Sequence, residues 1–192
     1  MAAIKIQTLP LDPLNQIITL LDQLRSRVPF AEEELAYHLQ LQAILTEQQE
    51  QSATALAAWR AALAQRWECE VRAQRMYATL RRQLLECSGP SAPYLSLCEP
   101  DTAIGTLTAS DLLNSLRRLA AVLSLIQPQP PFAEQSLPEL QAMITELQAA
   151  IAHTERCEEE RRRVQAEQRL LQELCQRAYQ RTRHRIAAHL SQ

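Results

Sequence analysis

Residues 28–35 read VPFAEEEL, and residues 130–137 read PPFAEQSL. The chain has only two phenylalanines, and both of them, Phe30 and Phe132, lie in the shared word PFAE, 102 residues apart. Each PFAE precedes a long stretch without glycine, which is the position of a corner that leads into a long helix. The recurrence of this corner indicates that the chain is built from two related halves.

Other rare residues recur in the same order. Tyr77 matches Tyr179 at the offset of 102 residues, and the motif Asp-x-Leu-Asn occurs at 12–15 and again at 111–114. A biased composition produces chance matches of leucine and glutamine, but ordered matches of Phe, Tyr and Asp-x-Leu-Asn are much less expected. We therefore predict an internal duplication, because such self-similarity is the signature of a repeated structural unit.

The composition predicts an all-α fold with few turns. The chain of 192 residues contains only two glycines, whereas folds rich in β-sheet need glycine at many turns. Ala, Leu, Gln, Glu and Arg dominate the sequence, and all five are good helix formers. Aromatic residues make up only 4%, so the core is expected to be aliphatic and thin.

The spacing of apolar residues and of proline and glycine divides the chain into two similar series of elements. Each series is predicted to hold a short helix followed by a long one. The first repeat, 1–100, contains a short helix over 12–27, a long helix over 30–87 and a loop over 88–100; the second repeat, 101–192, contains a short helix over 111–126 and a long helix over 137–190.

Polar residues at the predicted helix starts suggest how these helices are capped. Asp12 precedes Pro13, which fits an N-cap followed by proline in the first turn. Ser110 and Asp111 are expected to cap the second short helix. Ser136 and Glu139 form the pattern S-x-x-E, which predicts a capping box at the start of the second long helix.

Two equal halves favour a pseudo-twofold arrangement, with the two long helices antiparallel and residue numbers of facing residues adding up to about 220. We expect one elongated, coiled-coil-like bundle with a short helix packed at each end. Tyr77 would then lie near Met143, and Tyr179 near Leu41. The alternative is that the long helices break near residues 50–60 and 155–165 and fold into one compact bundle.

The four aromatic positions that match between the two halves are expected to be structural. Phe30 and Phe132 would fix the corners by packing against the first turn of each long helix or against the preceding short helix. Tyr77 and Tyr179 would lie at the far end of each long helix, against the start of the other.

Charge and cysteine content bound the cellular setting. The net charge of −2 provides no overall field that attracts nucleic acid or a membrane surface. Five cysteines spread along a helical chain do not form a recognisable disulfide framework. The longest apolar run is too short to span a bilayer, and the first residues lack the apolar region of a signal peptide. We therefore expect a cytoplasmic protein without a transmembrane segment.

Catalytic and metal-binding motifs are absent from the sequence. It holds no nucleotide-binding glycine motif, no G-x-S-x-G and no H-E-x-x-H. His153 and Cys157 are four residues apart on a predicted helix, but two ligands do not complete a metal site. We expect no enzymatic activity, no cofactor and no metal.

Two stretches are candidate interaction sites. Trp59, Leu63 and Trp67 follow one another at intervals of four residues, and tryptophan is enriched at protein interfaces. The same residues would otherwise fill a thin core. The carboxyl-terminal stretch carries four arginines without an acidic neighbour, which suggests either complementation of the helix dipole or a site for an anion: Arg177, Arg181, Arg183 and Arg185.

The sequence therefore favours a non-catalytic helical scaffold or adaptor that binds other proteins within a larger assembly, and a homo-oligomer is one form of such an assembly. One alternative is an assembly chaperone that clasps a protein client. The other is a module that binds nucleic acid or a membrane surface through the arginines. Nucleic acid is the less expected of these ligands, since the stretch resembles no common nucleic-acid-binding module.

Overall fold

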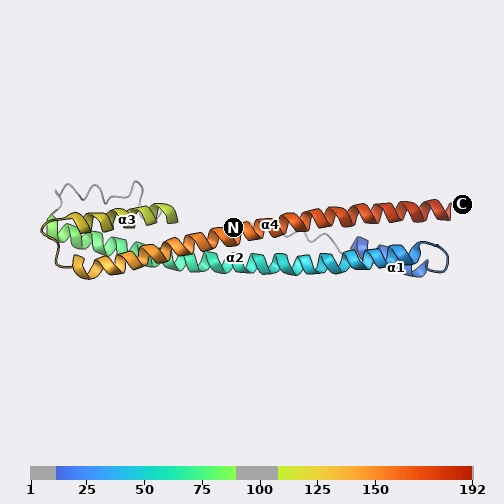
Figure 1. The fold of residues 1–192 in the computed structure, drawn as a ribbon, viewed down its shortest axis with the longest axis horizontal. Helices are drawn as coiled ribbons and strands as arrows, with labels where there is room; N and C mark the ends of the chain where they lie inside the picture. Colours follow the sequence, from blue (N-terminus) through green and yellow to red (C-terminus); the bar gives the residue numbers. More distant parts are fainter. Residues whose placement is uncertain (1–11, 90–107, 192) are drawn as a thin grey trace. The chain divides into compact units, whose positions relative to one another are not determined.

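The computed structural model describes residues 12–89 and 108–191, and within these ranges the chain consists of helices joined by turns, without a strand (Figure 1). This confirms the predicted fold class. The four helices are α1 (Asp12–Gln23), α2 (Ala31–Ser88), α3 (Ala109–Leu125) and α4 (Ala133–Leu190). Most of the predicted loop over 88–100, including Cys98, lies outside the described residues.

The two long helices have no interruption. α2 passes through residues 50–60 and α4 through residues 155–165 without a break. α2 ends at a glycine cap, because Gly89 has a φ of 77° and its N–H donates to the carbonyl oxygen of Leu85 at 2.9 Å. Glycine adopts this left-handed conformation without the steric cost that a β-carbon brings.

The amino-terminal boundary of α4 differs from the prediction. The helix begins at Ala133, so Ser136 and Glu139 lie inside it and form no cap. The N–H of Ala133 donates to Pro130 O at 2.9 Å, and the Ala133 side chain is completely buried. Packing at the corner therefore starts the helix earlier than the local S-x-x-E pattern indicates.

The cap of α3 is also displaced from the prediction. Thr108 is the N-cap, its hydroxyl oxygen accepts from Asp111 N–H at 3.2 Å, and its own N–H donates to the Asp111 carboxylate at 3.3 Å. This reciprocal pair is a capping box. Asp111 is thus the third helical residue, and Ser110 lies in the first turn.

The chain forms two compact units. Unit 1 comprises the residues up to Leu56 together with those from Glu160 onward, and unit 2 comprises Ala57–Glu159. Each unit contains one short helix, the first part of one long helix and the last part of the other. The compact units therefore divide the long helices, whereas the predicted repeats keep each long helix whole.

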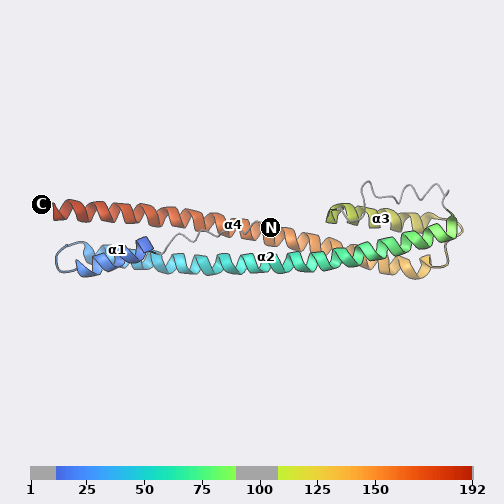
Figure 2. The same cartoon turned by 180° about the vertical axis from the view of Figure 1, so that it is seen from behind.

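In unit 1, the start of α2 runs antiparallel to the end of α4, and the two lie side by side in both views (Figures 1 and 2). Glu34 bonds to Arg185, and His38 bonds to Thr182, which is the direction and register expected from the sequence. The core consists of two aliphatic clusters that α1 completes, and their buried members are Leu14, Ile17, Leu21, Leu24, Val28, Ala31, Leu35, Leu41, Leu45, Cys175, Ala178 and Ile186.

In unit 2, the end of α2 runs antiparallel to the start of α4. Thr154 Oγ1 donates to Ala62 O at 3.3 Å, and Arg72 forms an ion pair with Glu146. α3 packs on this helix pair and completes a single core cluster, whose buried members include Tyr77, Leu80, Leu84, Leu112, Leu116, Leu119, Leu123, Leu140, Met143 and Leu147. Tyr77 and Met143 thus share a cluster.

Candidate interaction surfaces

The tryptophan stretch lies on α2 in unit 2. Trp67 is 65% exposed, whereas Trp59 and Leu63 are half-buried. Residues four apart on a helix lie about 40° from one another around its axis, so the three side chains form a stripe that turns progressively outward. The structure therefore divides this group into a partly covered end at Trp59 and an open end at Trp67.

The carboxyl-terminal arginines lie on α4 in unit 1, and three of the four have acidic partners. Arg185 donates to Glu34 at 2.8 Å, and an Arg181 nitrogen lies 3.7 Å from the same carboxylate. Arg177 lies 3.7 Å from Glu173. An incoming anion would have to compete with these carboxylates, which makes the cluster a weaker anion site than its sequence suggests.

A buried polar network links α2 and α4 in unit 1, and sequence reasoning missed it. The Thr182 hydroxyl donates to Glu34 Oε2 at 2.8 Å, and its oxygen lies 2.9 Å from His38 Nε2. Because the only hydroxyl proton of Thr182 is directed to Glu34, His38 Nε2 is the donor in the second bond. His38 and Thr182 are fully buried, and Glu34 is 5% exposed.

The network fixes the charge states of its members. Burial raises the pKa of the Glu34 carboxyl, but the hydrogen bonds from Thr182 and Arg185 and the charges of Arg181 and Arg185 outweigh it, so the pKa lies below its usual value. Burial lowers the pKa of His38, and the positive charge of Arg181 adds to this effect against the opposing charge of Glu34. At neutral pH the site therefore holds an ionised carboxylate and a neutral imidazole.

This network has no catalytic geometry. The Thr182 hydroxyl donates to a carboxylate instead of to the imidazole, so His38 cannot act on it as a base. His38 Nδ1 is buried and has no hydrogen-bond partner among the residues that the structure describes. The only clue in the sequence is that Glu34 and His38 are four residues apart and so share a helix face.

The four aromatic positions occupy core or corner sites. Phe30 packs against the core cluster of unit 1 that contains Ile17 and Ile186. The Arg185 guanidinium lies 4.0 Å from the centre of the Phe30 ring. Phe132 packs against the core of unit 2. Tyr77 is completely buried there, whereas Tyr179 is half-buried against the cluster that contains Ile186.

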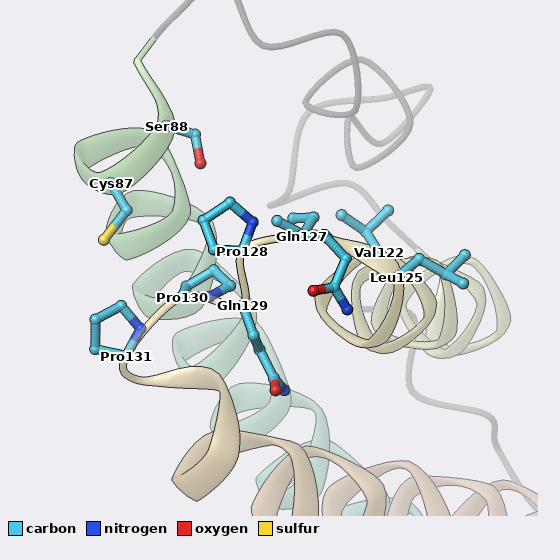
Figure 3. A pocket seen from close by; sticks show the side chains of 10 residues that line it. Cys87, Ser88, Val122, Leu125, Gln127, Pro128, Gln129, Pro130 and Pro131 are labelled. Atoms are coloured by element: carbon cyan, nitrogen blue, oxygen red, sulfur yellow. The ribbon is translucent and has the colours of Figure 1, made fainter.

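A pocket of about 530 Å³ lies in unit 2, where α2 ends and the proline-rich connection joins α3 to α4 (Figure 3). The side chains of Cys87, Val122 and Leu125 border it, together with the prolines 128, 130 and 131. Among the described residues that line it, Cys87 is the only ionisable one. The described lining is therefore mainly apolar and carries one thiol.

Within the described residues, no group of three or more His, Cys, Asp or Glu side chains is placed to hold a metal ion. The Cys157 sulfur lies 3.9 Å from both ring nitrogens of His153, which is a contact between two side chains only. The described helices also include none that is long and apolar enough to cross a membrane.

Comparisons of the chain with protein-family models, curated proteins and solved structures found no match.

Proposed function

We propose that this protein is a non-catalytic helical scaffold or adaptor that binds another protein through the face of α2 in unit 2. The observation that supports the proposal is the 65% exposure of Trp67 at the open end of the stripe that it forms with Leu63 and Trp59. Tryptophan contributes a large apolar area to an interface at a small cost in side-chain entropy, and it is enriched among residues that dominate binding energy.

The long helices support this role through their rigidity. The stripe lies within a helix of 58 residues that has no break, so its side chains are held at fixed spacing. A partner helix that lies in the groove beside such a stripe would recognise residues at intervals of four, which is a common mode of helix recognition. The protein would thereby hold a partner at a defined place in a larger assembly.

Internal duplication is the proposed origin of this scaffold. Residues 102 positions apart have similar burial: Ala31 and Ala133 are both 0% exposed, and Leu41 and Met143 are both 8% exposed. A copied unit would carry its pattern of buried positions with it while the surface diverged. A cytoplasmic setting is part of the same proposal, because Cys69 and Cys175 are free thiols in the cores of the two units.

The test is affinity purification from the native cell with three chains: wild type, Trp67→Ala and Leu125→Ala. Leu125 is 78% exposed in the same unit, so it is a matched control for the loss of an exposed apolar side chain. We expect a partner that is recovered with wild type and Leu125→Ala, is lost with Trp67→Ala, and is retained at high salt. Equal recovery with all three chains would contradict the proposal.

A further inference from the structure

Unit 1 has an exposed apolar face that the tryptophan stripe does not include. Tyr37 and Ile44 on α2 are 39% and 43% exposed, and Leu170 and Leu174 on α4 are 62% and 55% exposed. Tyr37 and Ile44 are two helical turns apart and share a side of α2, and Leu170 and Leu174 share a side of α4. We call these four residues the apolar face.

One contact between α2 and α4 shows that the apolar side of each helix belongs to the same surface of the pair. Arg181 follows Leu174 by seven residues and so lies on the same side of α4. Its guanidinium lies 5.3 Å from the centre of the Tyr37 ring, which joins the α4 side to the α2 side. The apolar face is therefore one continuous surface of the helix pair.

The short helix α1 covers a different surface of the pair. The side-chain amide of Gln42 donates to Asn15 of α1 at 2.7 Å. Ile44 is two residues after Gln42, and at about 100° per residue the two side chains lie about 160° apart around α2. α1 thus leaves the apolar face uncovered.

The corresponding surface of unit 2 is charged. The positions 102 residues away from Ile44 and Leu174 are Glu146 and Arg72, and these two side chains form an ion pair across the α2–α4 pair. The register that pairs His38 with Thr182 places Ile44 opposite residue 176, two residues from Leu174. The ion pair of unit 2 shows that an antiparallel helix pair accepts charged residues at such surface positions, so packing alone does not explain the apolar residues of unit 1.

The charges that flank the apolar face indicate what covers it. Residues 31–56 of α2 contain five glutamates and no lysine or arginine, whereas residues 160–190 of α4 contain eight arginines and three glutamates. Glu47 follows Ile44 by three residues and Arg177 follows Leu174 by three, so each lies on the outer flank of its helix, and both are exposed. The face therefore has an acidic edge and a basic edge.

The geometry points to a second copy of this chain as the partner of the apolar face, in a homodimer with a twofold axis parallel to the helices. This axis places α2 of each copy against α4 of the other, so the acidic edge of one copy meets the basic edge of its partner along both sides. The register that pairs His38 with Thr182 places Glu47 within about one helical turn of Arg177 in the opposite copy.

The available area is sufficient for a stable dimer. Residues 31–56 extend over about 39 Å at 1.5 Å per residue. Two helices packed about 9 Å apart present a face roughly 18 Å wide. The product is about 700 Å² for each copy, which is close to the roughly 800 Å² that each partner buries in a typical stable complex. The dimer surface lies in unit 1 and the adaptor surface lies in unit 2. An experiment that rejects one of these two proposals therefore leaves the other standing.

The first test exchanges the chemistry of the two units. The double variant Ile44→Glu/Leu174→Arg introduces in unit 1 the ion pair that unit 2 already holds, so its helices are expected to fold, which circular dichroism verifies. Light scattering over a range of concentrations should give a dimer for wild type and a monomer for this variant. Leu125→Arg, which adds a charge at an exposed leucine of unit 2, should remain dimeric. A monomeric wild type, or a variant that remains dimeric, would overturn the proposal.

The second test examines the symmetry axis. Glu47→Arg and Arg177→Glu should each weaken the dimer, because each places like charges on both edges of the interface. A mixture of the two variant chains should restore dimers, since the mixed dimer pairs opposite charges on both edges. Failure of the mixture to associate would exclude an axis parallel to the helices and with it this dimer.

Discussion

The two units have the same arrangement of helices, but the polar and apolar residues at some corresponding core and surface positions are exchanged. In unit 2, the facing positions Leu80 and Leu140 are buried and apolar, and the surface positions Arg72 and Glu146 form an exposed ion pair. In unit 1, the positions 102 residues away hold buried polar residues inside and exposed apolar residues outside. The inner pair is Thr182 and His38, and the outer pair is Leu174 and Ile44.

The exchange shows which features the helix arrangement needs and which residue types it can accept. An antiparallel helix pair with a short third helix needs side chains that fill the core, and buried polar groups are acceptable there when they are hydrogen-bonded to one another. Unit 1 meets that condition with the Glu34–Thr182–His38 network. An uncovered apolar surface has no such structural reason, and it is therefore the better indicator of a binding partner.

The largest expected effect is a difference in the free energy of unfolding between variants of the two tyrosines, Tyr77 and Tyr179. Tyr77→Ala should destabilise the protein by about 3–5 kcal/mol, because it leaves a cavity in the core of unit 2 in place of a completely buried ring. Tyr179→Ala should cost roughly 1–2 kcal/mol, since its ring is half-buried. Urea denaturation followed by circular dichroism measures both. Equal losses would show that the two units bury this position to the same degree.

The next effect concerns the polar network of unit 1. Glu34→Ala should lower the free energy of unfolding by about 2–3 kcal/mol, because the Thr182 hydroxyl and Arg185 lose a charged hydrogen-bond partner. Glu33→Ala is the matched control, since Glu33 is its exposed neighbour and should change stability by less than about 0.5 kcal/mol. Similar values for the two variants would mean that the network contributes no stability.

The same network should make stability depend on pH. Since the pKa of folded His38 lies below the usual 6.5, the unfolded chain binds this proton first, and stability falls as the pH decreases below about 6.5. The lowered pKa of Glu34 gives a second loss below about 4.5, for the same reason. Urea midpoints measured on both sides of pH 6.5 test the first step.

The variant His38→Leu/Thr182→Leu copies the leucine pair of unit 2 and serves as the control for that measurement. It should remove the loss near pH 6.5 and lower stability at neutral pH by about 1–3 kcal/mol, because the buried carboxylate of Glu34 loses the hydrogen bond that the Thr182 hydroxyl donates. A variant that keeps the wild-type pH dependence would show that other histidines cause it.

The smallest effect is expected at the surface pair of unit 2. Arg72→Ala and Glu146→Ala should each leave the urea midpoint close to that of wild type, because the two side chains are 54% and 48% exposed and water screens their attraction. The double variant should match the sum of the single variants. A large coupling between them would indicate that this pair holds the helices of unit 2 together, and the contrast with unit 1 would then need another explanation.

Sequence reasoning located the helices well and their caps poorly. Long runs without glycine and almost without proline predict long helices, because few residues there oppose the helical backbone; Pro138 near the start of α4 is the exception. The start of α4 at Ala133 and the Thr108 cap of α3 depend on contacts and hydrogen bonds at the corners, which local patterns describe only in part. The apolar face was missed because Ile44 and Leu174 are ordinary helical residues until α1 is seen to lie elsewhere.

The sequence by itself determined the helical fold class and the order of short and long helices, because these follow from local propensity and from the spacing of apolar residues. Only the tertiary structure decided which polar residues meet and which apolar residues remain uncovered. Glu34 and Thr182 are 148 residues apart along the chain, so their hydrogen bond exists only once α2 and α4 pack. Exposure, likewise, belongs to a folded surface and not to a residue type.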